Sequence, residues 1–449
     1  MRPRRDIPVT RRPAHGAGLH ARIFALLWFS LLFWACGYLA LVTISGHTYF
    51  RSIAFGLASI FALWLILGAL FSDGEPIPAP DWYLWCALAA WAGWSVASLG
   101  WSLHPAYTKA ELGTEIGWGM ATAAIFYVAA RSAASFRTLT VAAVACAGFL
   151  SALAVTAAIT TGTFDPEHAL VRSHGGAGAF STYLVLCMPL LPLLIAPKPV
   201  GFGSGPWPLA IGVGVFALLL VGARLTENRM IWVALASGFV VAAVLAAWRW
   251  RARLIRAPKR WGGVLMALLV LVGALFVDAA VQRARTDFKP DTPVAQSFAD
   301  DPRFALWQHT FERIRERPWT GFGFGKAILA DELRGELHDP MLAHAHNLFV
   351  SQWLQTGAIG VATLVAMLAA LTWCYWTFLR GSDGTLAAVG LAGLVMLVTF
   401  VVKNLTDDFM IRPTSKEFWA LNAFLIGYGV RKLRERPLRG ELRNLRPNS

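Results

Sequence analysis

Residues 344–347 read HAHN and lead directly into the apolar run LFVSQWLQTGAIGVATLVAMLAALTWCYWTF, which occupies residues 348–378. A helix needs about 20 apolar residues to cross about 30 Å of hydrocarbon, and at about 1.5 Å per residue this run exceeds one crossing. Gly357 and Gly360 interrupt the run. Broken helices are tolerated in membranes where they line a polar cavity. We therefore expect a membrane helix that begins beside a polar segment and bends near residues 355–357.

The whole chain has the composition of a membrane protein. Of its 449 residues, 56% are hydrophobic and only 15% are charged, whereas soluble domains carry about 25% charged residues. This composition excludes an ordinary soluble enzyme and predicts an all-α polytopic membrane protein with about twelve transmembrane helices. The segments long enough to cross a bilayer are 22–45, 52–72, 82–100, 112–130, 138–159, 178–196, 207–223, 229–248, 261–280, 348–378, 385–402 and 416–430.

Basic residues predict how the chain is oriented. The formal net charge is +14. If the Arg-rich residues 1–21 stay in the cytoplasm, the loops on that side hold most of the remaining excess of Lys and Arg, as the positive-inside rule requires. Helices one to nine then occupy 22–280, helices ten to twelve occupy 346–430, and 431–449 form a basic cytoplasmic tail. The charge therefore indicates membrane orientation, and we expect no nucleic-acid partner.

Two segments face the opposite, outer side of the membrane in this topology. Residues 281–345 form the longer segment, and residues 403–415 form a short polar loop between the last two helices. Apolar side chains recur at helical spacing within the longer segment, so we expect a small helical lid at the membrane surface. These side chains are Phe304, Trp307, Phe311 and Ile314, followed by Ile328, Leu329, Leu333 and Leu337.

Histidines gather where the expected lid re-enters the membrane. His346 and Asn347 stand immediately before the apolar run, and an imidazole there is suited to accept a proton from a hydroxyl nucleophile. The alternative is a histidine that only caps the helix or lies in the membrane interface. A metal site formed by His338, Asp339, His344 and His346 is conceivable, but the segment has no HExxH pattern or carboxylate pair at ligand spacing. We therefore expect no metal.

Arginines recur at the expected membrane boundaries. A guanidinium is planar and always charged, which suits it to phosphate oxygens, and ionisable groups at membrane depth point to function. Several arginines on one face favour an anionic ligand such as a pyrophosphate. The alternative is snorkelling to the interface or pairing with Glu227. The arginines are Arg172, Arg224, Arg229 and Arg303.

A glycine-rich run, PWTGFGFGK at residues 318–326, has a superficial likeness to a phosphate-binding loop. It does not match GxxxxGK[ST], because Ala327 follows the lysine, and no strand precedes it. Alternating glycine and aromatic residues are more typical of a turn that packs on the lid or dips into the interface.

An ordered set of short motifs resembles the bacterial O-antigen ligase and O-antigen polymerase superfamily, which also includes protein O-oligosaccharyltransferases. The motifs cover about residues 170–360 and follow the order of the family. The chain has Asn228 where the family usually has serine. The matching positions are Arg172 with its glycine-rich turn and Tyr183-Leu184, Thr226-x-Asn228-Arg229, Asp301-x-Arg303-x-x-x-Trp307, Pro318-x-x-Gly321-x-Gly323-x-Gly325, and His346-Asn347 followed by Gly357 and Gly360.

The resemblance implies a glycosyltransferase of GT-C-like architecture in the bacterial inner membrane, with its active site facing the periplasm. The implied donor is an O-antigen polysaccharide on undecaprenyl pyrophosphate, and the acceptor is lipid A–core oligosaccharide. His346 would be the general base of an inverting displacement that needs no cofactor, nucleotide or metal. Arg172, Arg229 and Arg303 would bind the pyrophosphate, and Asp407 would orient His346 or the acceptor. Further supporting candidates are Asn347, Arg224, Arg412, His344 and His338.

The acceptor is the least determined part of this prediction. A ligase, an O-antigen polymerase and a protein O-oligosaccharyltransferase share donor chemistry and differ in acceptor. We favour the ligase because the lid is a single compact loop. A polysaccharide transporter is the alternative outside enzymes, but it predicts inverted repeats with buried charges near the membrane midplane, and the two halves of this sequence show no such symmetry.

Overall fold

The structure, a computed structural model, describes residues 15–43, 48–71, 76–161, 174–196, 200–203, 205–254, a few residues between 270 and 281, 303–337 and 344–444. Every secondary-structure element in these ranges is helical. Together with the apolar helices below, this confirms the predicted all-α polytopic membrane protein.

Among the described residues, eight helices are long and apolar enough to cross a membrane. Each coincides with one of the predicted apolar segments. They are α1 (His15–Thr43), α2 (Thr48–Phe71), α6 (Ala133–Thr161), α8 (Ala177–Cys187) with its continuation η3 (Met188–Leu190) and α9 (Leu191–Leu194), α10 (Pro206–Leu225), α11 (Arg229–Leu254), α16 (Leu348–Arg380) and α17 (Gly384–Lys403).

The other predicted crossings have different outcomes. The segment 82–100 forms α3 (Trp82–Ala97) and η1 (Ser98–Trp101), followed by α4 (Pro105–Glu111). The segment 112–130 forms the π-helical η2 (Leu112–Gly117) and α5 (Trp118–Ala129), and 416–430 lies inside the longer α18 (Arg412–Asn444). The segment 261–280 lies mostly outside the described residues. The total of twelve crossings therefore stays a prediction.

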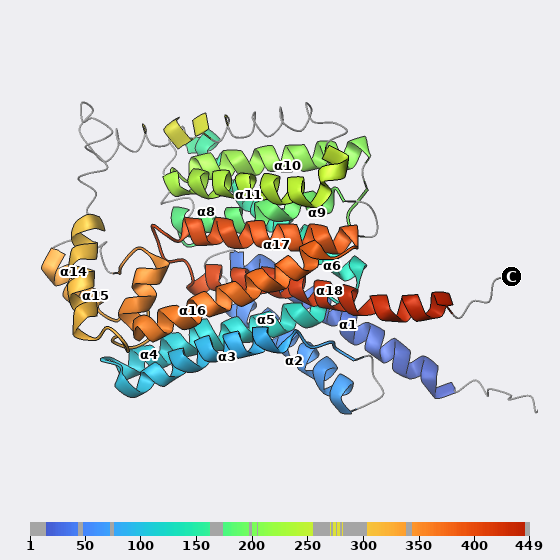
Figure 1. Cartoon of the computed structure of the whole chain (residues 1–449), viewed down its shortest axis with the longest axis horizontal. Helices are drawn as coiled ribbons and strands as arrows, with labels where there is room; N and C mark the ends of the chain where they lie inside the picture. The colour runs from blue at the N-terminus through green and yellow to red at the C-terminus, as the bar shows by residue number, and fades with distance from the viewer. Residues whose placement is uncertain are drawn as a thin grey trace, which may run out of the picture.

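The long helices lie side by side as a bundle (Figure 1). The closest pairings include α18 with α5, α1 with α2, and α16 with α17 and α3. Two short helices, α14 (Arg303–Glu316) and α15 (Ala330–Leu337), stand at the end of the bundle where α16 begins, away from the C-terminal end of α18 (Figure 1).

Helix α16 breaks at the predicted place. Gly357 has φ 71° and ψ −174°, which is a left-handed conformation that side chains disfavour. The turn formed by residues 318–325 fills the break: the amides of Phe322 and Gly323 donate to the carbonyls of Leu354 and Gln355 at 3.0 and 2.8 Å. The amide of Ala358 donates to Pro318 O at 2.8 Å. The glycine-rich run is therefore a turn that packs on α16.

The predicted lid has its own small core where α14 and α15 meet the first turns of α16. Apolar side chains from all three helices are buried together, and they hold the lid on the bundle. Phe311, one of the apolar side chains at helical spacing, is not part of this core and is 38% exposed. The buried residues are Leu306, Ile314, Phe322, Ile328, Leu329, Leu333 and Leu354.

Candidate functional site

Asp407 is the centre of a cluster of charged and titratable side chains. It lies in the loop between α17 and α18, and its Oδ1 is 3.5 Å from His346 Nδ1 and 3.6 Å from His344 Nε2. Lys326 Nζ lies 3.9 Å from the same oxygen. The lysine comes from the end of the glycine-rich turn and the histidines precede α16. Three segments distant in sequence therefore converge on one carboxylate.

Asn347 fixes the histidines at the start of α16. Its Oδ1 accepts hydrogen bonds from the amides of Phe349 (2.9 Å) and Val350 (3.1 Å), as an N-cap residue does. Its Nδ2 donates to Leu405 O at 2.8 Å, which ties the cap to the loop that carries Asp407. His346, one residue earlier, has a positive φ of 48°. The same side chain thus starts the helix and holds the two loops of the site together.

The lid holds the histidine segment from the other side. Trp307 of α14 donates from its indole Nε1 to Ala345 O at 2.7 Å, between His344 and His346. Lys326 Nζ donates to Asp408 O at 2.6 Å. The lid therefore contacts both loops of the cluster, and a lid that moved away would release the histidines.

Burial and charge set the protonation states of the cluster. Burial alone would raise the pKa of Asp407, but hydrogen bonding to His344 and His346 and the charges of Lys326 and Lys403 hold it well below its usual value. Burial lowers the pKa of His344 to about 4, against the opposing effect of Asp407. Asp407 is therefore ionised and His344 neutral throughout the physiological pH range.

This arrangement suits proton transfer. An ionised carboxylate beside one ring nitrogen of His346 orients the imidazole and stabilises the imidazolium formed when the ring takes a proton. The contact of 3.5 Å is longer than an ideal hydrogen bond, as is common before substrate binds. The ring of His344 lies against it, with centroids 3.8 Å apart, so the neighbouring group adds bulk without charge.

The same three side chains could also hold a cation. One ligand atom each from His344, His346 and Asp407 lies within 4.8 Å of the others. However, Asp407 Oδ1 already accepts the amide of Asp408 at 2.8 Å, and the ammonium of Lys326 faces it. A divalent ion there would meet a positive charge, so this geometry favours a metal-free cluster of close polar contacts over a metal site.

The structure describes some of the predicted arginine side chains and not others. Arg172 and His338 lie outside the described residues, and Arg303 begins α14 with its side chain also outside them. Arg224 and Arg229 lie at the facing ends of α10 and α11. Arg224 Nε is 2.6 Å from Asp278 Oδ2, so this arginine is paired internally. The assignment of the pyrophosphate arginines stays a prediction.

Arg412 lies at the start of α18, at the end of the loop that carries Asp407. It has a positive φ of 49°, and its backbone amide donates to both carboxylate oxygens of Glu115 at 2.9 and 2.8 Å. Glu115 also lies 3.6 Å from Lys416 Nζ. This buried carboxylate holds the backbone of Arg412, while the Arg412 side chain is exposed.

Sequence reasoning named Lys326 and Trp307 but gave neither its role in the site. Lys326 was treated only as the residue that fails a phosphate-loop pattern, although a lysine after a tight glycine turn is itself a signal of a fixed cation. Trp307 was identified only by helical spacing and by its place in a family motif, and its indole donates to the histidine segment. Glu115 gave no signal, because its partners lie almost 300 residues away in sequence.

Comparisons with known proteins agree with the motifs. Residues 214–365, about a third of the chain, match a family model described as O-antigen ligase. This segment runs from α10 into α16 and includes Lys326, His346 and Gly357. The general O-oligosaccharyltransferase of Acinetobacter baylyi is 25% identical over 197 residues. That match covers 41% of this chain and 33% of the relative, so the chain spans about a third of the relative's length. The resemblance to this superfamily is confirmed.

Proposed function

We propose that the protein transfers O-antigen polysaccharide from undecaprenyl pyrophosphate to lipid A–core at the periplasmic face of the bacterial inner membrane. The observation that carries this proposal is the contact between Asp407 and His346 at the start of a broken membrane helix. His346 lies within the segment that matches the O-antigen ligase model. A positioned histidine–carboxylate pair supports removal of a proton from a hydroxyl nucleophile, as the transfer reaction requires.

In the proposed reaction His346 takes the proton of an acceptor hydroxyl. The acceptor oxygen forms a bond to the anomeric carbon of the first donor sugar, and the bond from that carbon to the pyrophosphate oxygen breaks. Attack opposite the leaving group inverts the anomeric configuration. The electron pair leaves with the lipid pyrophosphate, and the proton stays on the imidazole, where the charge of Asp407 stabilises it.

Cations bind the leaving group in this proposal. Arg172, Arg229 and Arg303 contact the pyrophosphate and offset the charge that develops on it. Lys326, 3.9 Å from Asp407, adds a fixed positive charge beside the reacting centre. No metal, nucleotide or other cofactor takes part.

A second candidate differs only in the acceptor. The relative is a general O-oligosaccharyltransferase, and a protein hydroxyl in place of lipid A–core would need the same base and donor site. An O-antigen polymerase, in which another glycan chain is the acceptor, would also use them.

One assay separates these functions. Purified protein in lipid nanodiscs is given a polysaccharide donor on undecaprenyl pyrophosphate with lipid A–core, with a serine-rich protein acceptor, or with donor alone, each with and without EDTA. We expect elongation of lipid A–core, seen as a ladder on a gel, and the same rate with EDTA. Transfer only to the protein acceptor would indicate a protein O-oligosaccharyltransferase. Transfer only to other donor chains would indicate an O-antigen polymerase. Loss of activity in EDTA that zinc or magnesium restores would contradict the metal-free mechanism.

Replacing Asp407 by asparagine should lower kcat by about 100-fold, because the imidazolium loses its countercharge. The pKa of Asp407 is depressed in the folded protein, so its ionised contacts stabilise the fold above about pH 4 and are lost only as the pH falls further. The initial rate of the Asp407→Asn variant should therefore be lower than that of wild type at every pH between 5 and 8.

Asp408→Asn is the matched control. Asp408 is the neighbouring buried acid and accepts the Met410 amide at 3.3 Å, a role that an amide oxygen also fulfils. We expect this variant to keep a rate close to wild type. Equal rates for the two variants would remove Asp407 from the mechanism.

A further inference from the structure

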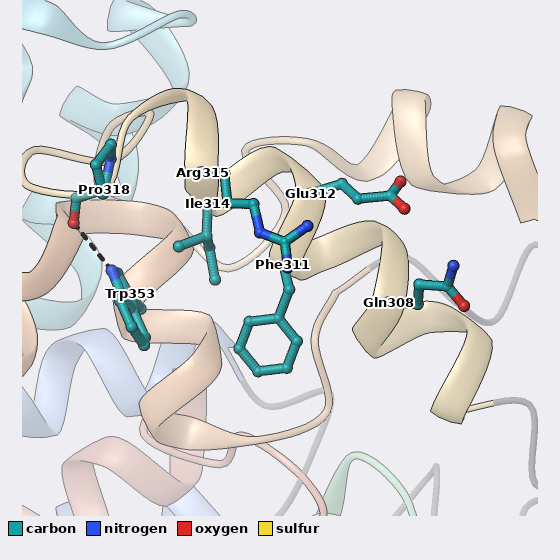
Figure 2. A pocket seen from close by; sticks show the side chains of 7 residues that line it. All are labelled: Gln308, Phe311, Glu312, Ile314, Arg315, Pro318 and Trp353. Atoms are coloured by element: carbon teal, nitrogen blue, oxygen red, sulfur yellow. Dashed lines mark hydrogen bonds between the residues drawn. The ribbon is translucent and has the colours of Figure 1, made fainter.

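A groove of about 490 Å³ lies between the lid helix α14 and the first part of α16. Ligand sites in proteins usually have volumes of about 300–1,000 Å³. Figure 2 shows the side chains around it, with the rings of Phe311 and Trp353 on either side of Ile314 and three polar side chains along α14. The lining residues are Gln308, Phe311, Glu312, Ile314, Arg315, Pro318 and Trp353.

The groove shares helices α14 and α16 with the candidate catalytic cluster, although no residue of the cluster lines it. Gln308, at one end, follows Trp307, whose indole bonds the carbonyl between the two histidines. Seven residues later, Arg315 approaches Pro318 and the turn at the break of α16. At about 1.5 Å per residue, the part of α14 that lines the groove is about 10 Å long. The groove therefore follows α14, the helix whose Trp307 contacts the histidine segment.

The walls combine aromatic rings with varied hydrogen-bonding groups. Phe311 is 38% exposed, and Trp353 is held in place because its Nε1 donates to Pro318 O at 2.9 Å (Figure 2). Flat rings pack against the C–H faces of sugar rings. The amide of Gln308, the carboxylate of Glu312 and the guanidinium of Arg315 are exposed, and they supply the donors and acceptors that sugar hydroxyls require.

The same walls are poorly suited to a bilayer surface. Of the four α14 residues that line the groove and are exposed, only Phe311 is apolar. Glu312 would repel anionic lipid headgroups, and its carboxylate lies 3.5 Å from His309. Arg315 is exposed, so its guanidinium faces solvent at the groove.

We propose that this groove binds sugar units of the donor glycan that lie beyond the sugar that reacts. This inference rests on the proposed function, and it holds for each of the three acceptors because all three reactions use a glycan donor. Binding of remote units holds the long donor in register and supplies energy that helps to orient the reacting carbon.

The test compares a polysaccharide donor with a donor that carries a single sugar, both on undecaprenyl pyrophosphate. Phe311→Leu keeps an apolar side chain but removes the ring, and Arg315→Gln removes the charge. For each variant we expect the ratio of kcat/KM for the polysaccharide donor to kcat/KM for the one-sugar donor to fall about tenfold. For Phe311→Leu this is about the scale of one aromatic contact, and for Arg315→Gln it is about the scale of one hydrogen bond to a charged group. Trp319→Leu and Arg334→Gln, on exposed lid residues outside the groove, should keep the wild-type ratio.

A binding measurement without catalysis completes the test. Lipid-free polysaccharide, released from the donor by mild acid, should give saturation-transfer NMR signals with wild-type protein in nanodiscs and weaker signals with Phe311→Leu. An unchanged donor ratio would overturn the proposal. So would a rise in acceptor KM alone, which indicates an acceptor site, or an effect seen only in nanodiscs of anionic lipid and not in those of neutral lipid, which indicates contact with the bilayer surface. The role of His346 as general base and the role of the groove can fail separately. If His346 is not the base, the His346→Ala protein stays active, and the glycan-binding signal of the groove persists.

Discussion

Replacing His346 by alanine is expected to abolish glycan transfer while the protein still folds and inserts. A general base contributes about 10²- to 10⁴-fold to a rate, and among the described residues no other side chain combines the Asp407 contact with this position at the helix start. His344 contacts the same oxygen, but its pKa of about 4 makes it a much weaker base. The measurement is the initial rate of transfer from a lipid-linked polysaccharide donor to lipid A–core.

Two variants make this result interpretable. His346 has a φ of 48°, a conformation that asparagine tolerates better than alanine, so His346→Asn removes the base with less backbone strain. His344→Ala removes a ring from the same cluster and is expected to keep most of the activity. Thermal unfolding of each variant in nanodiscs shows whether it folds. An active His346→Asn enzyme, or a His344→Ala enzyme that is as inactive as His346→Ala, would refute the assignment of His346 as the base.

The sequence was sufficient for features that depend on local pattern. Apolar length marks the membrane helices, and glycine inside the long run of 348–378 marks the break at Gly357, because no other residue adopts that backbone conformation without strain. The position of Asn347 before an apolar run likewise predicts the start of a helix, and the side chain forms that cap.

Local sequence patterns do not predict contacts between segments that are distant in sequence. Asp407 was proposed only from its likeness to an acidic position in ligases, and nothing local shows that it meets Lys326, 81 residues earlier. The helical spacing of α14 did not separate Phe311 from the core residues, because periodicity gives the width of an apolar face only approximately. Its exposure instead makes one wall of the groove.

Replacing Gly357 by alanine is expected to prevent the lid turn from docking on α16. A Cβ at this position would lie 2.1 Å from the carbonyl carbon and oxygen of Trp319, and φ 71° is unfavourable for a side chain. The contact is with backbone, so no rotamer change relieves it. Separating the turn from the helix would cost the bonds to Leu354 and Gln355 and the bond from Ala358 to Pro318. We expect a loss of about 3 kcal/mol or more of stability.

This loss should also reach the catalytic cluster, because the same turn ends at Lys326, which bonds the Asp407 loop. We therefore expect Gly357→Ala to lower both the unfolding temperature and the transfer rate, measured in the same nanodisc preparation. Gly335→Ala is the matched control, since a Cβ there meets nothing within 4 Å and alanine favours the helix α15 by about 0.5–1 kcal/mol. A Gly357→Ala protein as stable as the Gly335→Ala protein would show that the break in α16 does not depend on glycine. Normal transfer by an unstable Gly357→Ala protein would show that the lid turn does not position the cluster.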